Sequence, residues 1–558
     1  MVDPYDPEGF RAAGHAVIDQ LADYLAGTAT GEGPVLRYAP PEASLNKWPS
    51  PLEMDQRVPF ADLLPQVIAG SHHIHHPRYV GHQVSAPIGS AALAELVSAV
   101  LNNGTAEFEM GPVSNAMEKR LLEWLGSALG FGPVVEGLFT SGGSAGNLTA
   151  LAAARQSVVG VDAWNDGLAG KQPLAILTSE QAHYSNDRAA RILGFGAGGV
   201  VPVGVDDRFR LDPARLREAH RRAEDSGRRV FAVVGSACST ATGAFDPLEP
   251  IADYAAEHGL WFHVDGAHGA VAALAPAYRH LVAGIERADS VVLDAHKMLL
   301  MPALVTAVLY RRPGAADRAF HQEQSYVGFD THGGAFAWWD SGLRTLECTK
   351  RMMALELYAS LLEHGPSFFA DHVTRTFDLA SWFARELEAA ADFELATEPQ
   401  ANIVCFRFTP DGVLDLDALQ LAVRDELVRS GAFYVVKTRL RDRVHLRTTI
   451  INARTDEADL RALMEAIRAA ANPGADSTRG GPLVSGGAGR DEDHGHRRIR
   501  RAHGYRGASL TTPTQRPRPG VSATPQNTPP NRSENGHGDR SGARGRGIRQ
   551  RRTLRFGL

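Results

Sequence analysis

Between Gly137 and Tyr310 the sequence alternates short apolar runs with longer amphipathic segments, and no other feature restricts the fold as strongly. Short apolar runs bounded by turn residues are typical of buried strands, and apolar residues three or four positions apart are typical of helices. Strands that alternate with helices predict an α/β fold with a mainly parallel sheet covered on both faces. The predicted strands are 137–140, 173–178, 200–205, 230–235, 260–264, 290–293 and 304–310, and the predicted helices are a run ending at 160, 183–193, 212–227 and 248–258.

The regions on either side of this alternation have a different pattern. An amphipathic segment at 10–25 and a passage rich in Pro and Gly predict a helical N-terminal arm at 1–70, ahead of a large domain at 71–345. Long helical patterns up to residue 391 are followed by short strands, and together they predict a smaller C-terminal α/β domain at 346–472. Its predicted strands are 402–408, 434–437 and 445–452, and its last helix is 457–471.

Residues 473–558 differ from the rest of the chain in charge and composition. They hold 17 Arg and 6 acidic residues, a balance of +11, so the net charge of −6 leaves −17 for residues 1–472. A segment with so few apolar residues cannot bury enough surface to offset the entropy of ordering, which predicts a disordered tail. The tail is either merely solvated, an arginine-rich arm for nucleic acid or another polyanion, or an unselected translation of GC-rich DNA.

Composition excludes several classes of protein for the rest of the chain. With 44% apolar residues among 558, the chain can fill a large core, so disorder along its whole length is excluded. No stretch of about twenty uncharged apolar residues occurs, so we expect no membrane partner. Cys238, Cys348 and Cys405 are odd in number and far apart, which favours neither a disulfide framework nor a zinc site and indicates a cytoplasmic protein.

Three predicted strands end in residues with strong chemical character. Lys297 follows the strand 290–293 and is one of only six lysines, Asp265 follows the strand 260–264, and His183 follows the strand 173–178. Ligands of such sheets bind beyond the carboxyl ends of the strands, so we expect these side chains to lie close together.

The strand 137–140 ends in a glycine turn, Ser141-Gly142-Gly143-Ser144, which leads into a predicted helix. Bare backbone amides at a helix start can bind an anion such as phosphate. A phosphate seat, a carboxylate, a histidine and a lysine together meet the needs of pyridoxal 5′-phosphate. Each feature alone has a simpler explanation, since a strand-end Asp is usually a cap and a lone Lys usually a surface residue, but all four in this order are hard to explain separately.

On these motifs the sequence resembles the pyridoxal-phosphate-dependent amino-acid decarboxylases, the family of glutamate, aromatic-amino-acid, cysteine-sulfinate and diaminobutyrate decarboxylases. The likeness runs from about His76 to Asn452. It implies an aspartate-aminotransferase-like fold, a homodimer with the active site at the subunit interface, and pyridoxal 5′-phosphate as cofactor. The implied activity is decarboxylation of an L-amino acid to the amine and CO₂. Transamination or elimination on the same fold is an alternative.

The resemblance also implies roles for individual residues. Lys297 forms the Schiff base with the cofactor, Asp265 pairs with the pyridine nitrogen, and His183 stacks on the ring. Arg447 matches the arginine that binds the substrate α-carboxylate in glutamate decarboxylases. The remaining implied cofactor contacts are Gly142, Gly143, Ser144, Thr240, Ala267 and His296.

The proton donor is where the sequence departs from the family. Many relatives use a loop tyrosine to reprotonate Cα after CO₂ has left, and the matching segment 328–340 contains no tyrosine. Tyr326, just before that segment, is a candidate catalytic residue, and His332 and His183 are the other candidate donors. We predict simple decarboxylation; the alternative is oxidative deamination, in which the carbanion is diverted to oxygen and an aldehyde is released.

Substrate preference is predicted from His82 and Gln83, which stand where relatives acting on aromatic amino acids carry bulky apolar residues. A pocket for an aromatic side chain needs apolar walls, so we predict a polar or charged substrate such as an acidic or diamino acid, with Phe108 as a packing wall. Alternatively, His82 and Gln83 only satisfy each other or backbone groups.

A metal site and a nucleic-acid-binding protein are the two alternatives to this enzyme. The histidine-rich segment 71–77 suggests a metal site, but no helical i, i+4 pair backed by a carboxylate supports it, and we predict no metal. A nucleic-acid-binding protein with an inactive body is disfavoured, because such a protein needs none of Lys297, Asp265 and His183.

Overall fold

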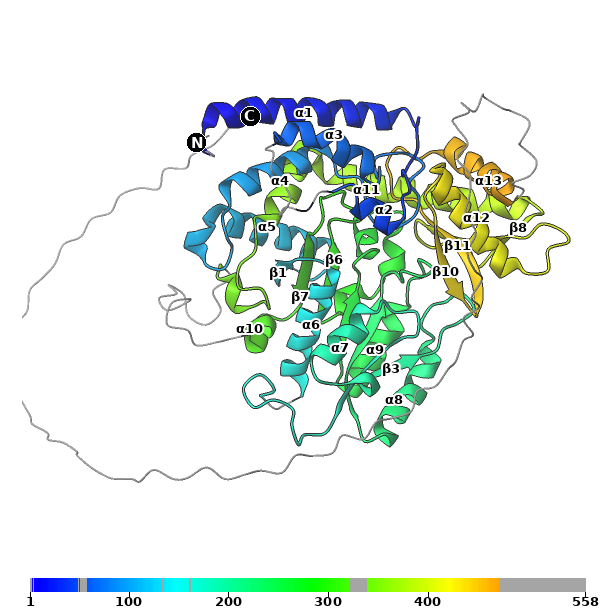
Figure 1. The fold of residues 1–558 in the computed structure, drawn as a ribbon. Helices are drawn as coiled ribbons and strands as arrows, with labels where there is room; N and C mark the ends of the chain where they lie inside the picture. The colour runs from blue at the N-terminus through cyan, green and yellow to red at the C-terminus, as the bar shows by residue number, and fades with distance from the viewer. Residues whose placement is uncertain are drawn as a thin grey trace, which may run out of the picture. The chain divides into compact units, whose positions relative to one another are not determined.

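A seven-stranded sheet forms the centre of the region with alternating strands and helices (Figure 1). The computed structural model describes residues 3, 5–48, 50, 58–132, 135–159, 162–320 and 339–471. The strands are β1 (Glu136–Thr140), β2 (Leu174–Ser179), β3 (Val200–Val203), β4 (Arg229–Ser236), β5 (Trp261–Asp265), β6 (Ser290–Asp294) and β7 (Thr306–Tyr310). Their order is β1-β7-β6-β5-β4-β2-β3, and only β7 pairs in the antiparallel sense, with β1 and with β6. The predicted α/β fold with a mainly parallel sheet is confirmed.

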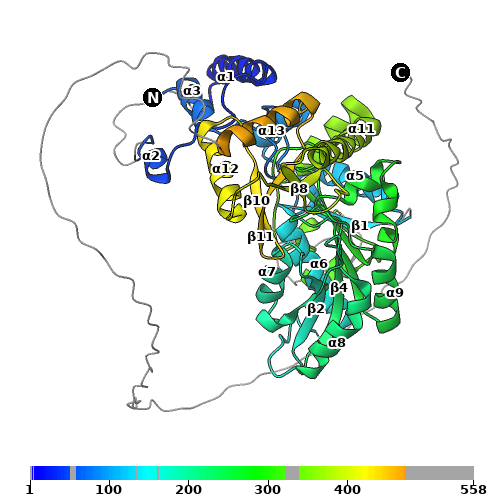
Figure 2. The same cartoon turned by 90° about the vertical axis from the view of Figure 1, so that its right-hand side faces the viewer.

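Helices cover both faces of this sheet, as the continuous apolar strands require. On one face α6 (Gly143–Val158), α7 (Ser185–Ile192) and α10 (Ala315–Phe320) share one apolar cluster with Phe231 and Val234 of β4. On the other face α8 (Leu216–Asp225) and α9 (Leu248–His258) pack on Val230 and Val233. Figure 2 shows α6 and α7 on one side of the strands and α9 on the other.

A second, antiparallel sheet follows in the C-terminal part of the described chain. Its order is β10-β11-β9-β8, and it has a core of its own. Helix α11 (Met353–Ala389) precedes it and is interrupted at Gly365, whose φ is +75°. The elements are β8 (Phe393–Leu395), β9 (Ile403–Phe408), α12 (Leu416–Ser430), β10 (Val436–Leu440), β11 (Arg443–Thr449) and α13 (Glu457–Ala471).

Helices also dominate the N-terminal part of the chain. They are α1 (Pro7–Ala29), α2 (Pro41–Leu45), α3 (Phe60–Gly70), α4 (Gly89–Leu101) and α5 (Pro112–Ala128). Helix α1 contains the predicted amphipathic segment, whereas α4 and α5 were not predicted. No helix in the described ranges has the length and apolar character needed to cross a bilayer. The predicted tail at 473–558 lies outside the described residues, and the predicted domain boundaries stay predictions.

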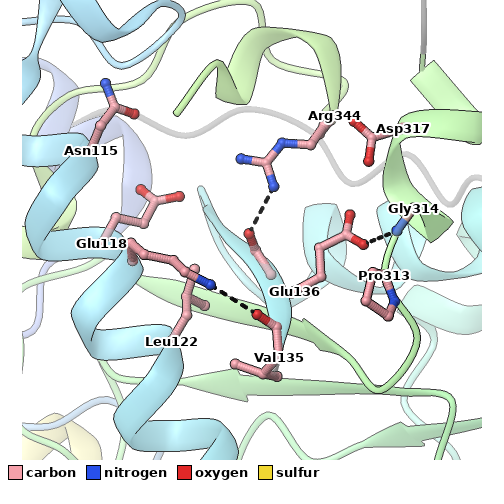
Figure 3. Close-up of a pocket in the computed structure, with 11 residues that line it drawn as sticks. Asn115, Glu118, Leu122, Val135, Glu136, Pro313, Gly314, Asp317 and Arg344 are labelled. Atoms are coloured by element: carbon pink, nitrogen blue, oxygen red, sulfur yellow. Dashed lines mark hydrogen bonds between the residues drawn. The ribbon is translucent and has the colours of Figure 1, made fainter. Parts of the chain in front are cut away.

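Charged side chains hold β1, the strand that leads to the glycine turn (Figure 3). Lys119 donates a hydrogen bond to the carbonyl of Val135 at 3.1 Å, and Arg344 donates to that of Gly137 at 3.4 Å. Glu118 accepts from the N–H of Phe139 at 2.9 Å, while buried Lys350 donates to the carbonyl of the same residue at 2.7 Å. These four contacts hold the backbone of residues 135–139, which leads to the glycine turn.

Candidate active site

One cavity of about 310 Å³ brings the predicted strand-end residues together. It lies at the carboxyl ends of β2, β4, β5 and β6, where α/β sheets place their ligands. Every predicted cofactor contact lines it. The lining residues are Ser141, Gly142, Gly143, Ser144, Asn147, His183, Ser185, Ser236, Cys238, Ser239, Thr240, Asp265, Ala267, His268, Asp294, His296, Lys297 and Leu304.

The glycine turn forms one end of this cavity. Gly142 has a φ of +103°, which only glycine adopts without strain, and α6 begins at the next residue. The first N–H groups of a helix have no intrahelical partner and carry partial positive charge. A Cβ at Gly143 would lie 3.1 Å from the carboxylate oxygens of Asp294 and 3.3 Å from Cβ of Ala267, so the backbone itself forms the wall here.

Asp265 places a carboxylate at the end of β5. Its side chain accepts hydrogen bonds from Nδ2 of Asn147 at 2.9 Å and Nδ2 of Asn186 at 3.1 Å, and the residue is only 6% exposed. Both donors are neutral amides, so the carboxylate keeps its charge available for a cationic ligand group. That arrangement suits a protonated ring nitrogen.

Lys297 lines the same cavity, and its ammonium lies 2.9 Å from a carboxylate oxygen of Asp294. Burial by itself would lower the pKa of Lys297, but the charge of Asp294 and its hydrogen bond outweigh this and raise the pKa. Asp294 also accepts from the hydroxyl of Thr306 at 2.6 Å. The ligand-free lysine is therefore held as an ammonium ion.

His183 lines the cavity from the segment before α7. Its Nδ1 lies 2.8 Å from Oγ of Ser185, and burial lowers the pKa of the ring, so the ring is neutral near pH 7. A neutral, fixed imidazole is suited to packing against a flat ligand ring.

The predicted substrate residues lie outside the lining of this cavity. Arg447 on β11 comes nearest, since it is 7% exposed and donates at 2.6 Å to the carbonyl of Thr240, a lining residue. His82 lies beside Tyr434, with ring centroids 5.7 Å apart. The amide nitrogen of Gln83 has no hydrogen-bond partner among the described residues, and the Phe108 side chain is exposed. Tyr326 and His332 lie outside the described residues.

Several residues of this site were not predicted from the sequence. Asn147 lies four positions after Gly143, on the same face of α6, and Asp294 lies three positions before Lys297; these spacings were available signals. No sequence signal pointed to Asn186 and His268, because the packing of distant segments brings these two residues to the site.

The cavity fits pyridoxal 5′-phosphate by the chemistry of its donors. The glycine turn and Ser144 would hold the phosphate, Asp265 the ring nitrogen, and Lys297 would supply the amine for covalent attachment. The volume is at the low end of that of known small-molecule sites.

Comparisons with known proteins lead to the same family. Residues 54–409 match the family described as "Pyridoxal-dependent decarboxylase conserved domain". The chain is 33% identical over 335 residues to cysteine sulfinic acid decarboxylase of Mus musculus, covering 60% of this chain and 68% of that protein. It is 29% identical over 402 residues to aromatic-L-amino-acid decarboxylase of Bacillus atrophaeus, covering 72% and 82%.

A solved structure agrees with the sequence matches. Mouse CSAD in its apo form superimposes with a TM-score of 0.77 at 28% identity, covering 84% of this chain and 99% of that one. With the site chemistry and the family match in agreement, the chain is a member of the pyridoxal-dependent decarboxylase family, an enzyme that decarboxylates an amino acid with pyridoxal 5′-phosphate as cofactor.

Proposed function

We propose that the substrate is an acidic L-amino acid, within the polar or charged class that His82 and Gln83 predict. The observation that carries this proposal is the positive charge of Arg447 and Arg424 at His82, which would favour a second carboxylate while Arg447 holds the α-carboxylate. A guanidinium has five N–H donors, and Nη1 of Arg447 donates to the carbonyl of Thr240 at 2.6 Å, so other donors of the group are left for a carboxylate. Relatives named for acidic substrates support it: acidic amino acid decarboxylase of Xenopus tropicalis is 29% identical over 408 residues.

Local charge separates an acidic substrate from a diamino one. Burial lowers the pKa of His82, and the positive charges of Arg447 and Arg424 lower it further. This potential would attract a second carboxylate and repel a second ammonium group.

The residues around the cavity then have distinct tasks. When bound, the cofactor supplies an electron-withdrawing ring that weakens the bonds at Cα of the attached substrate. Asp265 would keep the ring nitrogen protonated, and Lys297 would supply the amine that holds the cofactor. Arg447 holds the α-carboxylate and so determines its direction relative to the ring. Of the three candidate donors for the proton at Cα, His183 is the one within the described residues.

Replacing Arg447 with methionine tests the proposal. The variant would lose a charged, buried contact worth about 2–3 kcal/mol, so kcat/KM for the best acidic substrate would fall by roughly 30- to 150-fold. The measurement is CO₂ release from aspartate, glutamate, cysteine sulfinate, 2,4-diaminobutyrate and aromatic amino acids. The exposed Arg439→Met on β10 is the matched control. Preference for an aromatic or diamino substrate in the unaltered enzyme, or an unchanged R447M, contradicts the proposal.

The same assay under oxygen decides between the two product classes. Simple decarboxylation gives an amine and CO₂ in equal amounts without oxygen uptake. Aldehyde, ammonia and peroxide as the main products would establish the oxidative alternative, which the missing tyrosine at 328–340 keeps open.

Asp294 controls how readily the cofactor attaches. Attachment requires the neutral amine of Lys297, and Asp294 favours the ammonium form by raising the pKa. We expect attachment to speed up with increasing pH, and Asp294→Asn to shift this profile towards lower pH, giving roughly tenfold faster attachment at pH 7 for each unit that the pKa falls. Stopped-flow absorbance after mixing apoenzyme and cofactor measures it. An unshifted profile would show that Asp294 does not set the state of Lys297.

A homodimer fits the exposed apolar face of α4. Leu93, Leu96, Val97, Val100 and Leu101 are between 45% and 59% exposed there, an apolar face typical of a partner surface. We propose a second copy of the chain as its partner, as the family resemblance implies. Light scattering should give about twice 60.0 kDa. Val100→Asp should yield monomers, and Leu414→Asp, at a fully exposed residue just before α12, should not. A monomeric wild type would contradict the proposal.

A further inference from the structure

A chain of buried hydrogen bonds runs from the interior of the sheet to the carboxylate of the cofactor site. We propose that His263, which does not line the cavity, is a positioning residue: it fixes the side-chain amide of Asn147 so that this amide donates to Asp265. This inference rests on the proposed placement of the ring nitrogen against Asp265.

The orientation of the Asn147 amide follows from its partners. Its Nδ2 donates to Oδ2 of Asp265 at 2.9 Å and to Oγ of Ser185 at 2.9 Å, and the residue is 1% exposed. A carboxylate only accepts, so the amide nitrogen must face Asp265. The amide oxygen therefore points the other way, to Nε2 of His263 at 3.0 Å.

That oxygen in turn fixes the tautomer of His263. Because the amide oxygen only accepts, Nε2 of His263 must carry the proton, and Nδ1 must accept from the hydroxyl of Ser290, 2.9 Å away. The Ser290 oxygen accepts from Nε1–H of Trp261 at 2.8 Å. Every proton in the series then has an acceptor.

A charged His263 would break this order. Its Nδ1–H would donate to the Ser290 oxygen beside the Trp261 N–H, and the Ser290 proton would lose its acceptor. His263 is 0% exposed, and burial lowers its pKa to about 4, which agrees with a neutral ring at working pH. The imidazole thus acts as a fixed donor.

The second amide proton of Asn147 reaches the other ring contact. Ser185 accepts it and lies 2.8 Å from Nδ1 of His183, to which the Ser185 backbone N–H also donates at 3.3 Å. A backbone N–H only donates, so Nδ1 of His183 accepts and its proton sits on Nε2. Both N–H groups of Asn147 are therefore used, and a rotated amide would lose both contacts.

Loss of the His263 donor would leave the amide oxygen of Asn147 buried and without a hydrogen-bond partner. Because this is costly, the amide would turn to a new orientation and lose its hydrogen bond to Asp265. Only a ligand that pairs with the charge of Asp265 should therefore bind more weakly. A cofactor analogue with carbon in place of the ring nitrogen provides this distinction, since it has the phosphate and aldehyde but no nitrogen to pair.

The experiment measures the dissociation constants of pyridoxal phosphate and of this carbon analogue for the purified full chain by equilibrium dialysis. We expect His263→Phe to weaken binding of the natural cofactor about tenfold and binding of the analogue less than twofold. His372→Phe, which changes another buried histidine that does not line the cavity, should alter neither constant. Asn147→Ser should behave like H263F and replaces it if H263F does not fold.

The outcomes separate this inference from the proposal beneath it. Equal weakening of both ligands by H263F and N147S would show a merely structural role and overturn the inference. Asp265→Asn should discriminate between the ligands at least as strongly as H263F. If it does not, the placement of the ring nitrogen at Asp265 is wrong. If Asp265→Asn discriminates between the two ligands while H263F and N147S do not, the placement of the ring nitrogen stands and only the proposed role of His263 is wrong.

Discussion

Lys297→Ala is expected to lower kcat by at least about 1000-fold while leaving the fold intact. The variant lacks the amine that we propose attaches the cofactor, and removal of a covalent catalytic group has effects of this size or larger. Removing the ammonium also leaves buried Asp294 without its cation, so we expect a modest loss of stability beside the loss of activity. CO₂ release and thermal unfolding measure the two effects.

Lys437→Ala on β10 is the control, because that lysine is exposed and does not line the cavity. It should keep full activity. If the alanine variant of Lys297 retained even a tenth of wild-type kcat, another residue would have to supply the amine.

The second large effect is expected at Lys350. Its ammonium donates to the carbonyl of Phe139 at 2.7 Å and lies 3.7 Å from a carboxylate oxygen of Glu118, and both residues are buried. Lys350→Met leaves the charge of Glu118 buried without this partner, which typically costs about 3–5 kcal/mol of unfolding free energy. Urea unfolding followed by circular dichroism measures the loss.

The double variant E118Q/K350M distinguishes the charge effect from a simple packing defect. Removing both charges of a buried pair is often close to neutral, so the double variant should recover most of the loss. A loss below about 1 kcal/mol in K350M, or no recovery in the double variant, would show that the pair does not hold β1.

Much of the central sheet follows from local sequence. Strands such as β2 and β5 are apolar along their whole length because helices cover both faces, so each appears as a bounded apolar run. Because the carboxyl ends of parallel strands meet at one edge of the sheet, the sequence also predicts that Asp265 and Lys297 lie at that edge. The antiparallel direction of β7 was not predictable, since an apolar run has no direction.

The missed elements have identifiable causes. Helix α4 carries apolar side chains on its exposed face as well as its buried one, which blurs the amphipathic period. Helix α12 buries only Gln420, Val423, Leu427 and Val428, and β8 has three residues, so their signals are weak.

The site shows the same division between local and distant information. That His183, Asp265, Lys297 and the glycine turn share one cavity could be predicted because each follows a strand, whereas Thr240, Ala267 and His296 were expected only from the family resemblance. His263 appeared to be an ordinary core residue two positions before Asp265, because its role depends on Asn147, 116 positions away in sequence. The substrate residues depend on how β11 and the segment near His82 meet the sheet, which no single segment encodes.

The most direct test of the account is to identify the lysine that carries the cofactor. The holoenzyme would be reduced with borohydride, digested, and analysed by mass spectrometry for a pyridoxyl group on lysine. The account predicts the modification on Nζ of Lys297 and on none of the other five lysines, including buried Lys350. A stable pyridoxyl group on another lysine, or none after reduction of cofactor-saturated protein, would contradict it.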